Sequence, residues 1–122
     1  MILYASRTGN VRAIIQKLGL PAQDLSQVST VDAPFLLFTY TDGLGSVPPS
    51  VATFMASYHS LCKGIIVSGN QNFGHAFFGR AGDLLAQQYQ LPLIEKLDLR
   101  GTAANYEVIQ RFYHTIWKEG QS

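Results

Sequence analysis

The stretch Ser6-Arg7-Thr8-Gly9-Asn10 constrains the fold more than any other part of the chain, because it joins a short apolar run directly to a helical pattern. The apolar run at residues 1–5 indicates a buried strand, and residues 11–18 carry apolar side chains at helical spacing. A strand that turns at once into a helix brings several free backbone N–H groups to one point, at the positive end of the helix dipole. The stretch therefore predicts an anion site, and phosphate is the usual occupant of such a site.

The side chains of this loop favour a phosphate monoester over a nucleoside triphosphate. Ser6, Thr8 and Asn10 supply short neutral donors, and Gly9 lets the backbone come close to a ligand. The loop has neither the lysine nor the GxxxxGK[ST] spacing that is typical of triphosphate-binding loops. The same residues also suit a capped turn without a ligand, since Ser, Thr and Asn are common helix caps.

The composition is typical of one compact α/β domain. A chain of 122 residues can bury a real core but is too short for two domains, so we expect a single domain over residues 1–122. Hydrophobic residues make up 47% of the chain and charged residues 14%, which excludes disorder. No apolar run is long enough to span a membrane and no signal-peptide pattern opens the chain, so we expect a cytoplasmic protein without membrane contacts.

Charge and metal-binding residue types exclude several further classes. A formal net charge of +1 gives no reason to expect nucleic-acid binding. Cys62 is the single cysteine, so neither an intrachain disulfide nor a CxxC redox motif is possible. The three histidines have no metal-ligand spacing, and we expect no metal site.

The rest of the chain alternates between strand and helix patterns. We expect strands at residues 1–5, 22–26, 34–40, 64–68 and 93–99. Beyond the helix at residues 11–18, helical spacing groups Val51, Phe54, Met55 and Tyr58; Phe77, Ala81, Leu84 and Leu85; and, after Thr102 as N-cap, Tyr106, Ile109, Tyr113, Ile116 and Trp117. Alternation with right-handed crossovers implies a doubly wound five-stranded parallel sheet in the order 2-1-3-4-5, with helices on both faces. The stretch 27–33 is polar and lacks a helical period, so the second crossover is unusually short.

Three polar loops that contain glycine follow strands of this predicted sheet, at residues 6–10, 41–47 and 69–75. In an open parallel sheet, ligands bind beyond the carboxyl ends of the strands, at the point where the strand order reverses. The three loops would meet at that edge, and together they are stronger evidence for a ligand site than any one loop alone. The sequence therefore predicts a ligand site there.

The chemistry of the loops favours FMN, with the phosphate at residues 6–10 and the isoalloxazine ring between the other two loops. Leu44 and Phe73 are the apolar residues nearest the loop tips, and each would cover one flavin face unless it anchors its loop to the core. Asn70 and Asn72 would contact the polar edge of the pyrimidine ring, unless they hydrogen-bond to their own backbone.

Four segments resemble the NrdI proteins, which are small flavodoxin-like proteins associated with class Ib ribonucleotide reductase. They are SRTGN at residues 6–10, TYTDGLGSVP at 39–48, SGNQNFG at 68–74 and LDLRGT at 97–102, and they span most of the chain in the same order. The resemblance implies a flavodoxin-like fold and noncovalently bound FMN. It also implies that a donor reduces the flavin, which then reacts with molecular oxygen. The resulting superoxide or peroxide would go to the radical subunit of the reductase, for assembly of its dimanganese–tyrosyl radical cofactor.

The resemblance also assigns the site residues. The phosphate loop comprises Ser6, Arg7, Thr8, Gly9, Asn10 and Val11; the loop beside flavin N5 comprises Thr41, Asp42, Gly43, Leu44 and Gly45; and the loop on the other side of the ring contributes Asn70, Asn72, Phe73 and Gly74. Gly43 is the expected catalytic residue, because a glycine peptide can rotate to offer its carbonyl to the N–H that forms at N5 on reduction. Asp42 occupies a position that often holds a neutral residue, and a carboxylate there would oppose negative charge on a reduced flavin.

The alternative function is that of a flavodoxin acting as a one-electron carrier between enzymes. Such carriers are typically acidic proteins that dock on basic partners through their charge, whereas this chain has no excess of acidic residues. A phosphorylated receiver domain would need carboxylates after the first strand, and Ala5-Ser6 stands there instead. A small phosphatase would need a cysteine in the phosphate loop, but Cys62 lies at the start of a later strand.

Overall fold

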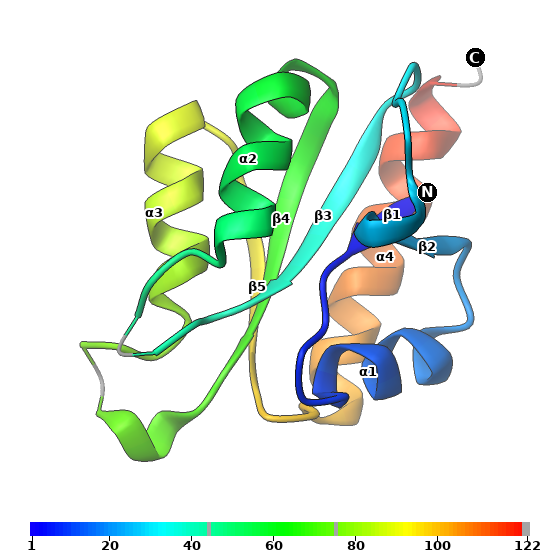
Figure 1. Ribbon diagram of the computed structural model, residues 1–122. Helices are drawn as coiled ribbons and strands as arrows, with labels where there is room; N and C mark the ends of the chain where they lie inside the picture. The colour runs from blue at the N-terminus through cyan, green and yellow to red at the C-terminus, as the bar shows by residue number, and fades with distance from the viewer. Residues whose placement is uncertain (44, 75, 121–122) are drawn as a thin grey trace.

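The computed structural model describes residues 1–43, 45–74 and 76–120, without the side chains of residues 118–120. Its five strands form one parallel sheet in the order β2-β1-β3-β4-β5 (Figure 1), which confirms the predicted topology. The strands are β1 (Ile2–Tyr4), β2 (Ala22–Asp24), β3 (Phe35–Tyr40), β4 (Cys62–Gly69) and β5 (Leu93–Asp98). The α-helices are α1 (Asn10–Leu18), α2 (Pro49–Tyr58), α3 (Arg80–Tyr89) and α4 (Ala103–Gly120), with short 3₁₀ turns η1 (Leu25–Gln27), η2 (His59–Leu61) and η3 (Gln71–Phe73).

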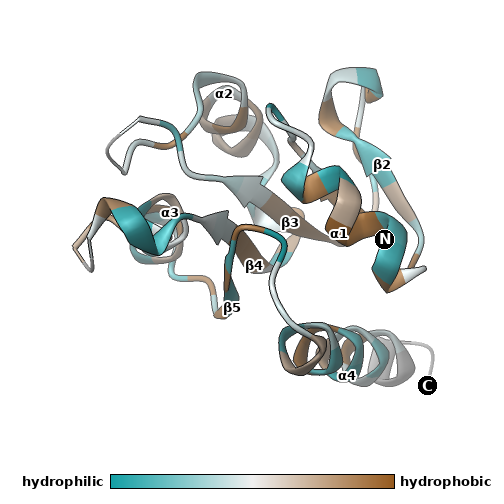
Figure 2. Cartoon of the chain, turned by 90° about the horizontal axis from the view of Figure 1, so that it is seen from below, coloured by the Kyte–Doolittle hydropathy of each residue, from teal (hydrophilic) through white to brown (hydrophobic). Residues whose placement is uncertain are grey.

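The sheet separates two apolar cores. Helices α1 and α4 cover one face and α2 and α3 cover the other (Figure 1). Side chains of β3 alternate between the two cores, because successive residues of a strand point to opposite faces: Leu36 and Phe38 join the first core, and Phe35 and Leu37 the second. In Figure 2 the central strands β3 and β4 carry the brown of hydrophobic residues, as expected of strands buried on both faces.

The second strand is shorter than predicted. The sequence suggested residues 22–26, but β2 ends at Asp24, whose carboxylate accepts hydrogen bonds from the backbone N–H and the hydroxyl of Ser26, both at 2.9 Å. This side-chain cap turns the chain into η1 and stops the strand. Among the described residues no α-helix connects β2 to β3; Leu25, Val28 and Val31 pack against the second core instead.

The third helix begins later than the apolar spacing suggested. Phe77 was expected on the inner face of that helix, but α3 starts only at Arg80, after Gly79 with φ of +63°. Phe77 belongs to the turn before the helix and is only partly buried. Two other predicted elements differ from the observed ones by one or two residues at their ends. β1 covers residues 2–4, where 1–5 were predicted, and β4 covers 62–69, where 64–68 were predicted.

The start of α4 agrees with the prediction. The Thr102 hydroxyl accepts a hydrogen bond from the N–H of Asn105 at 3.4 Å, and the Asn105 side chain accepts one from the N–H of Thr102 at 2.8 Å. This reciprocal pair satisfies two backbone donors that the helix itself leaves free. Within the described residues, no helix combines the length and apolar character that crossing a membrane requires.

Candidate functional site

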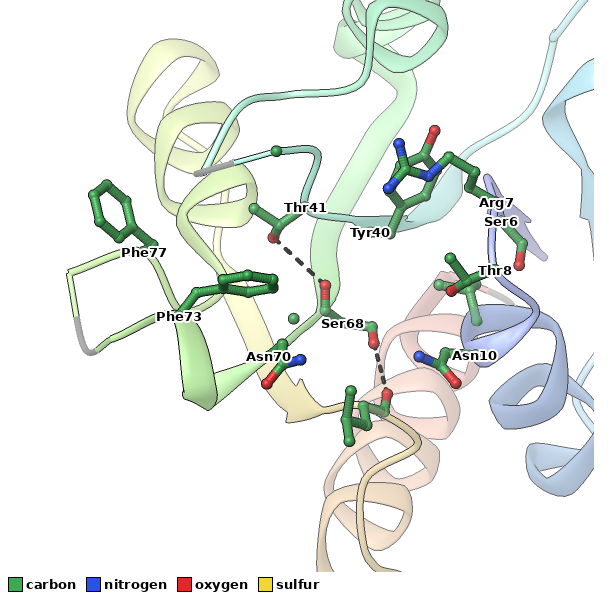
Figure 3. A pocket seen from close by; sticks show the side chains of 14 residues that line it. Ser6, Arg7, Thr8, Asn10, Tyr40, Thr41, Ser68, Asn70, Phe73 and Phe77 are labelled. Atoms are coloured by element: carbon green, nitrogen blue, oxygen red, sulfur yellow. Dashed lines mark hydrogen bonds between the residues drawn. The ribbon is translucent and has the colours of Figure 1, made fainter.

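A cavity of about 270 Å³ lies at the carboxyl ends of β1, β3 and β4 (Figure 3). Its lining residues are Ser6, Arg7, Thr8, Asn10, Val11, Tyr40, Thr41, Gly43, Ser68, Gly69, Asn70, Phe73, Phe77 and Leu99. Most come from the three loops that the sequence singled out; the others lie at the start of α1, at the ends of β3 and β4, before α3 and in the turn after β5. The convergence of the three loops at one sheet edge is therefore a property of the fold.

The first loop presents unpaired donors to this cavity. Gly9, with φ of +91°, precedes α1, and a glycine adopts this left-handed conformation without steric cost. The N–H groups of Asn10 and Val11 donate to no other described residue, and neither does the Thr8 hydroxyl. The Ser6 hydroxyl accepts the N–H of Arg12 at 3.4 Å and keeps its own hydrogen free to donate. The helix N-terminus thus offers the free donors that an anion needs.

The second loop is a tight hairpin. The backbone groups of Asp42 and Ser46 pair in both directions, with N···O distances of 2.8 and 2.7 Å. Gly43, with φ of +50°, sits inside this hairpin and lines the cavity. The Asp42 carboxylate accepts hydrogen bonds from the Gly43 N–H at 3.1 Å and from the Arg7 guanidinium at 2.8 Å. The hairpin is therefore fixed both by its own backbone and by the first loop.

The third loop is held by its own side chain and by β5. The Asn70 amide oxygen accepts the N–H of Asn72 at 2.9 Å, and the Asp98 carboxylate accepts the N–H of Gln71 at 3.1 Å. Asn70 thus caps η3. Bonding to its own backbone is one of the two roles that the sequence suggested for Asn70, the other being contact with the ligand. Phe73 projects from η3 with 57% of its surface exposed. The loop presents an amide and an uncovered aromatic ring beside the cavity.

Sequence reasoning missed several residues that line the cavity. Ser68 is buried, and its hydroxyl donates to the Leu99 carbonyl at 2.6 Å (Figure 3). The Leu99 N–H donates to the Gly69 carbonyl at 2.7 Å, and Leu99 takes a φ of +55°, which is unusual for a residue with a side chain. Tyr40 lies under Arg7, with 5.7 Å from the guanidinium carbon to the ring centre.

The cavity gathers most, but not all, of the predicted site residues. Those that line it are Ser6, Arg7, Thr8, Asn10, Val11, Thr41, Gly43, Asn70 and Phe73. Those that do not line it are Gly9, Asp42, Gly45, Asn72 and Gly74. Leu44 lies outside the described residues. Tyr40 and Ser68 could have been found from their place at the ends of predicted strands, and Leu99 from its place in the segment LDLRGT, whereas no sequence signal marked Phe77 as a site residue.

The electrostatics of the cavity are close to neutral. Arg7 is the one charged residue among the described lining residues, and its charge is paired with Asp42 just outside the lining. No group of three His, Cys, Asp or Glu residues in the described part of the chain has an arrangement that could hold a metal ion. The site therefore offers hydroxyl, amide and backbone donors with apolar walls rather than charge.

Comparison with known proteins identifies relatives over most of the chain. Residues 2–111 match the sequence profile of a family described as NrdI flavodoxin-like. A protein named NrdI from Bacillus licheniformis is 36% identical over 110 residues, which cover 88% of this chain and 82% of the relative. A protein NrdI from Escherichia coli is 33% identical over 128 residues, covering 97% of this chain and 93% of the relative. A protein NrdI from Deinococcus radiodurans is 35% identical over 115 residues, covering 91% and 80%.

Solved structures show the same architecture at lower identity. A short-chain flavodoxin associated with a bacterial microcompartment superposes with a TM-score of 0.72 at 20% identity, covering 97% of this chain and 95% of the other. A mutant flavodoxin from Pseudomonas aeruginosa gives a TM-score of 0.59 at 19% identity, covering 94% and 93%. At such identities these likenesses support the fold alone.

Proposed function

The chain belongs to the family of NrdI flavodoxin-like proteins, and on that basis we propose that it binds FMN in the cavity described above and serves a class Ib ribonucleotide reductase. Family and fold together imply a flavin cofactor. The observation that supports FMN in particular is a set of free hydrogen-bond donors at the start of α1. They are the N–H groups of Asn10 and Val11 and the Thr8 hydroxyl. Neutral donors at a helix N-terminus suit a phosphate monoester.

The remaining walls suit the flavin ring. The apolar side chains of Phe73, Phe77 and Leu99 provide flat or extended surface, while Thr41 and Asn70 provide polar groups nearby. Apolar walls with a few placed polar groups are typical of cofactor sites. A bound flavin would supply the redox and oxygen chemistry, and the protein would supply binding and orientation.

We assign to Gly43 the role that the sequence suggested. In the hairpin between Asp42 and Ser46, Gly43 already adopts the left-handed region, and a Cβ built on it would meet no atom within 4 Å. Glycine has comparable access to positive and negative φ, so its peptide can turn at little cost. We propose that this freedom lets the Gly43 carbonyl accept the N–H at flavin N5 after reduction.

The proposed partner is the radical subunit of the reductase, which would receive an oxygen-derived oxidant for assembly of its dimanganese–tyrosyl radical cofactor. Phe73 and Leu99 both line the cavity and are 57% and 43% exposed, so their apolar surface is available to a partner that docks over the cavity. Docking of this face would place the cavity mouth against the partner. A flavin-reducing donor and molecular oxygen complete the proposed reaction partners.

The experiment has two steps. The purified protein should become yellow with FMN and release the flavin on denaturation; a protein that takes up no FMN would contradict the proposal. The reduced holoprotein, mixed with oxygen, Mn²⁺ and the metal-free radical subunit, should then generate a tyrosyl radical that electron paramagnetic resonance detects. FMN uptake without radical formation, but with electron transfer to other acceptors, would instead support the one-electron carrier function.

A further inference from the structure

We propose that Arg7 and Asp42 act as a matched charge pair that keeps the flavin site electrostatically neutral and thereby sets the relative affinity for reduced and oxidised FMN. This inference rests on the proposed FMN binding. Arg7 and Asp42 would be positioning residues, since each acts through charge and through the other rather than by contact with the reacting atoms.

The pair joins two of the three loops around the cavity. The Arg7 guanidinium donates to one Asp42 carboxylate oxygen at 2.8 Å, although the two residues lie 35 positions apart in the sequence. The same oxygen accepts the Gly43 N–H at 3.1 Å. On its other side the guanidinium lies over the Tyr40 ring, with its carbon 5.7 Å from the ring centre. Arg7 thus contacts both the Asp42 carboxylate and the Tyr40 ring, and Figure 3 shows Arg7 over Tyr40.

The carboxylate itself has little freedom to move away. Asp42 is fixed by two backbone hydrogen bonds to Ser46, and its side chain is 30% exposed, against 61% for Arg7. Asp42 immediately precedes Gly43, which lines the cavity. The negative charge is therefore held within the proposed N5 loop, and the more exposed arginine is the partner that neutralises it.

Reduction makes the flavin more negative, so nearby charges act mainly on the reduced state. An unpaired carboxylate would weaken the binding of reduced FMN, and an unpaired guanidinium would strengthen it. Because the two charges are paired at 2.8 Å, each offsets part of the other's effect on a group in the cavity. Removing the Arg7 charge and removing the Asp42 charge should therefore change the affinity for reduced FMN in opposite directions. A purely structural role would not produce opposite changes.

The test measures the ratio of the dissociation constants of reduced and oxidised FMN, obtained from binding titrations and from the midpoint potential of bound against free flavin. Arg7→Gln should raise this ratio and Asp42→Asn should lower it, each by roughly three- to tenfold at low ionic strength. The double variant should return to within about twofold of the wild type. Arg7→Lys keeps the charge but not the planar group over Tyr40, so its ratio should lie closer to the wild type than that of Arg7→Gln.

The pair Arg111 and Glu107 on α4 provides a matched control. It is also an exposed ion pair, at 2.6 Å, and neither residue lines the cavity. Arg111→Gln and Glu107→Gln make the same changes in net charge and should leave the ratio unchanged. A ratio is used because any loss of affinity that is equal in both redox states cancels in it.

The outcomes separate this inference from the proposed function. If the wild-type protein does not bind FMN, both the proposed function and the proposed role of the charge pair are contradicted. Suppose that the wild-type protein binds FMN, but Arg7→Gln and Asp42→Asn shift the ratio in the same direction or no more than the control variants do. That result would overturn the proposed role of the charge pair and leave the proposed function intact. Melting temperatures identify a variant that fails to fold. In that case the other single substitution decides the result, by shifting the ratio in its expected direction by more than the matched α4 variant does.

Discussion

The sharpest test of the phosphate site is the substitution Thr8→Val. The Thr8 hydroxyl lines the cavity and makes no hydrogen bond with any described residue, so its removal disturbs no internal contact. Valine has the same branched shape as threonine and differs mainly by the missing donor. Ser6→Ala would be less informative, because the Ser6 hydroxyl also accepts the N–H of Arg12.

The expected loss follows from the kind of bond removed. A hydroxyl that donates to a phosphate makes a charge-assisted hydrogen bond worth about 1.5–3 kcal/mol. Because about 1.4 kcal/mol corresponds to tenfold in affinity, Thr8→Val should weaken FMN binding by roughly 12- to 150-fold. Riboflavin has no phosphate, so its affinity should stay within about twofold.

The assay is a fluorescence titration of the apoprotein with FMN and with riboflavin. Thr115→Val serves as the control, since the Thr115 hydroxyl donates to the Arg111 carbonyl within α4, away from the cavity. It should leave both affinities unchanged. An equal loss of FMN and riboflavin affinity in Thr8→Val would show that the phosphate does not lie at this loop.

Two further predictions concern the exposed apolar residues. Phe73→Asp should weaken binding to the radical subunit at least tenfold in a titration, whereas Val108→Asp, at a 41% exposed position on α4, should not; equal effects would reject the proposed docking face. Leu99→Gly should be more stable than Leu99→Ala by about 1 kcal/mol in urea denaturation, because alanine keeps a Cβ at φ of +55° and glycine does not. A glycine variant no more stable than the alanine variant would show that this backbone is unstrained.

The topology was predictable because its signals are local. Each central strand is a continuous apolar run and each polar loop follows directly, so strand order and the ligand edge follow from general rules of parallel sheets. The errors lie where a tertiary or conformational effect overrides periodicity. Phe77 fits the helical spacing of Ala81 and Leu84, but Gly79, with φ of +63°, delays the helix until residue 80. The end of β2 depends on a side-chain cap that competes with the strand.

The charge of the site was not predictable in the same way. From the sequence, Asp42 is a carboxylate beside the N5 loop, with an expected cost for a reduced flavin. The structure adds Arg7 at 2.8 Å, a contact between residues that no periodic pattern connects. The sequence supplies both charges, but only the packing of the first loop against the second shows that they are partners.

The missed residues have a common cause, which Ser68 illustrates. Its backbone carbonyl accepts the N–H of Thr41 at 3.2 Å, and its hydroxyl donates to the Leu99 carbonyl at 2.6 Å. One buried serine at the end of β4 therefore positions the start of the second loop and the turn after β5. Leu99 tolerates its left-handed backbone because this bond and the bond from its own N–H to Gly69 hold it on both sides. Ser68 and Leu99 lie in two of the segments that resemble the NrdI proteins, but their hydrogen bond joins positions 31 apart in the sequence, so it becomes visible only when the strand ends are brought together.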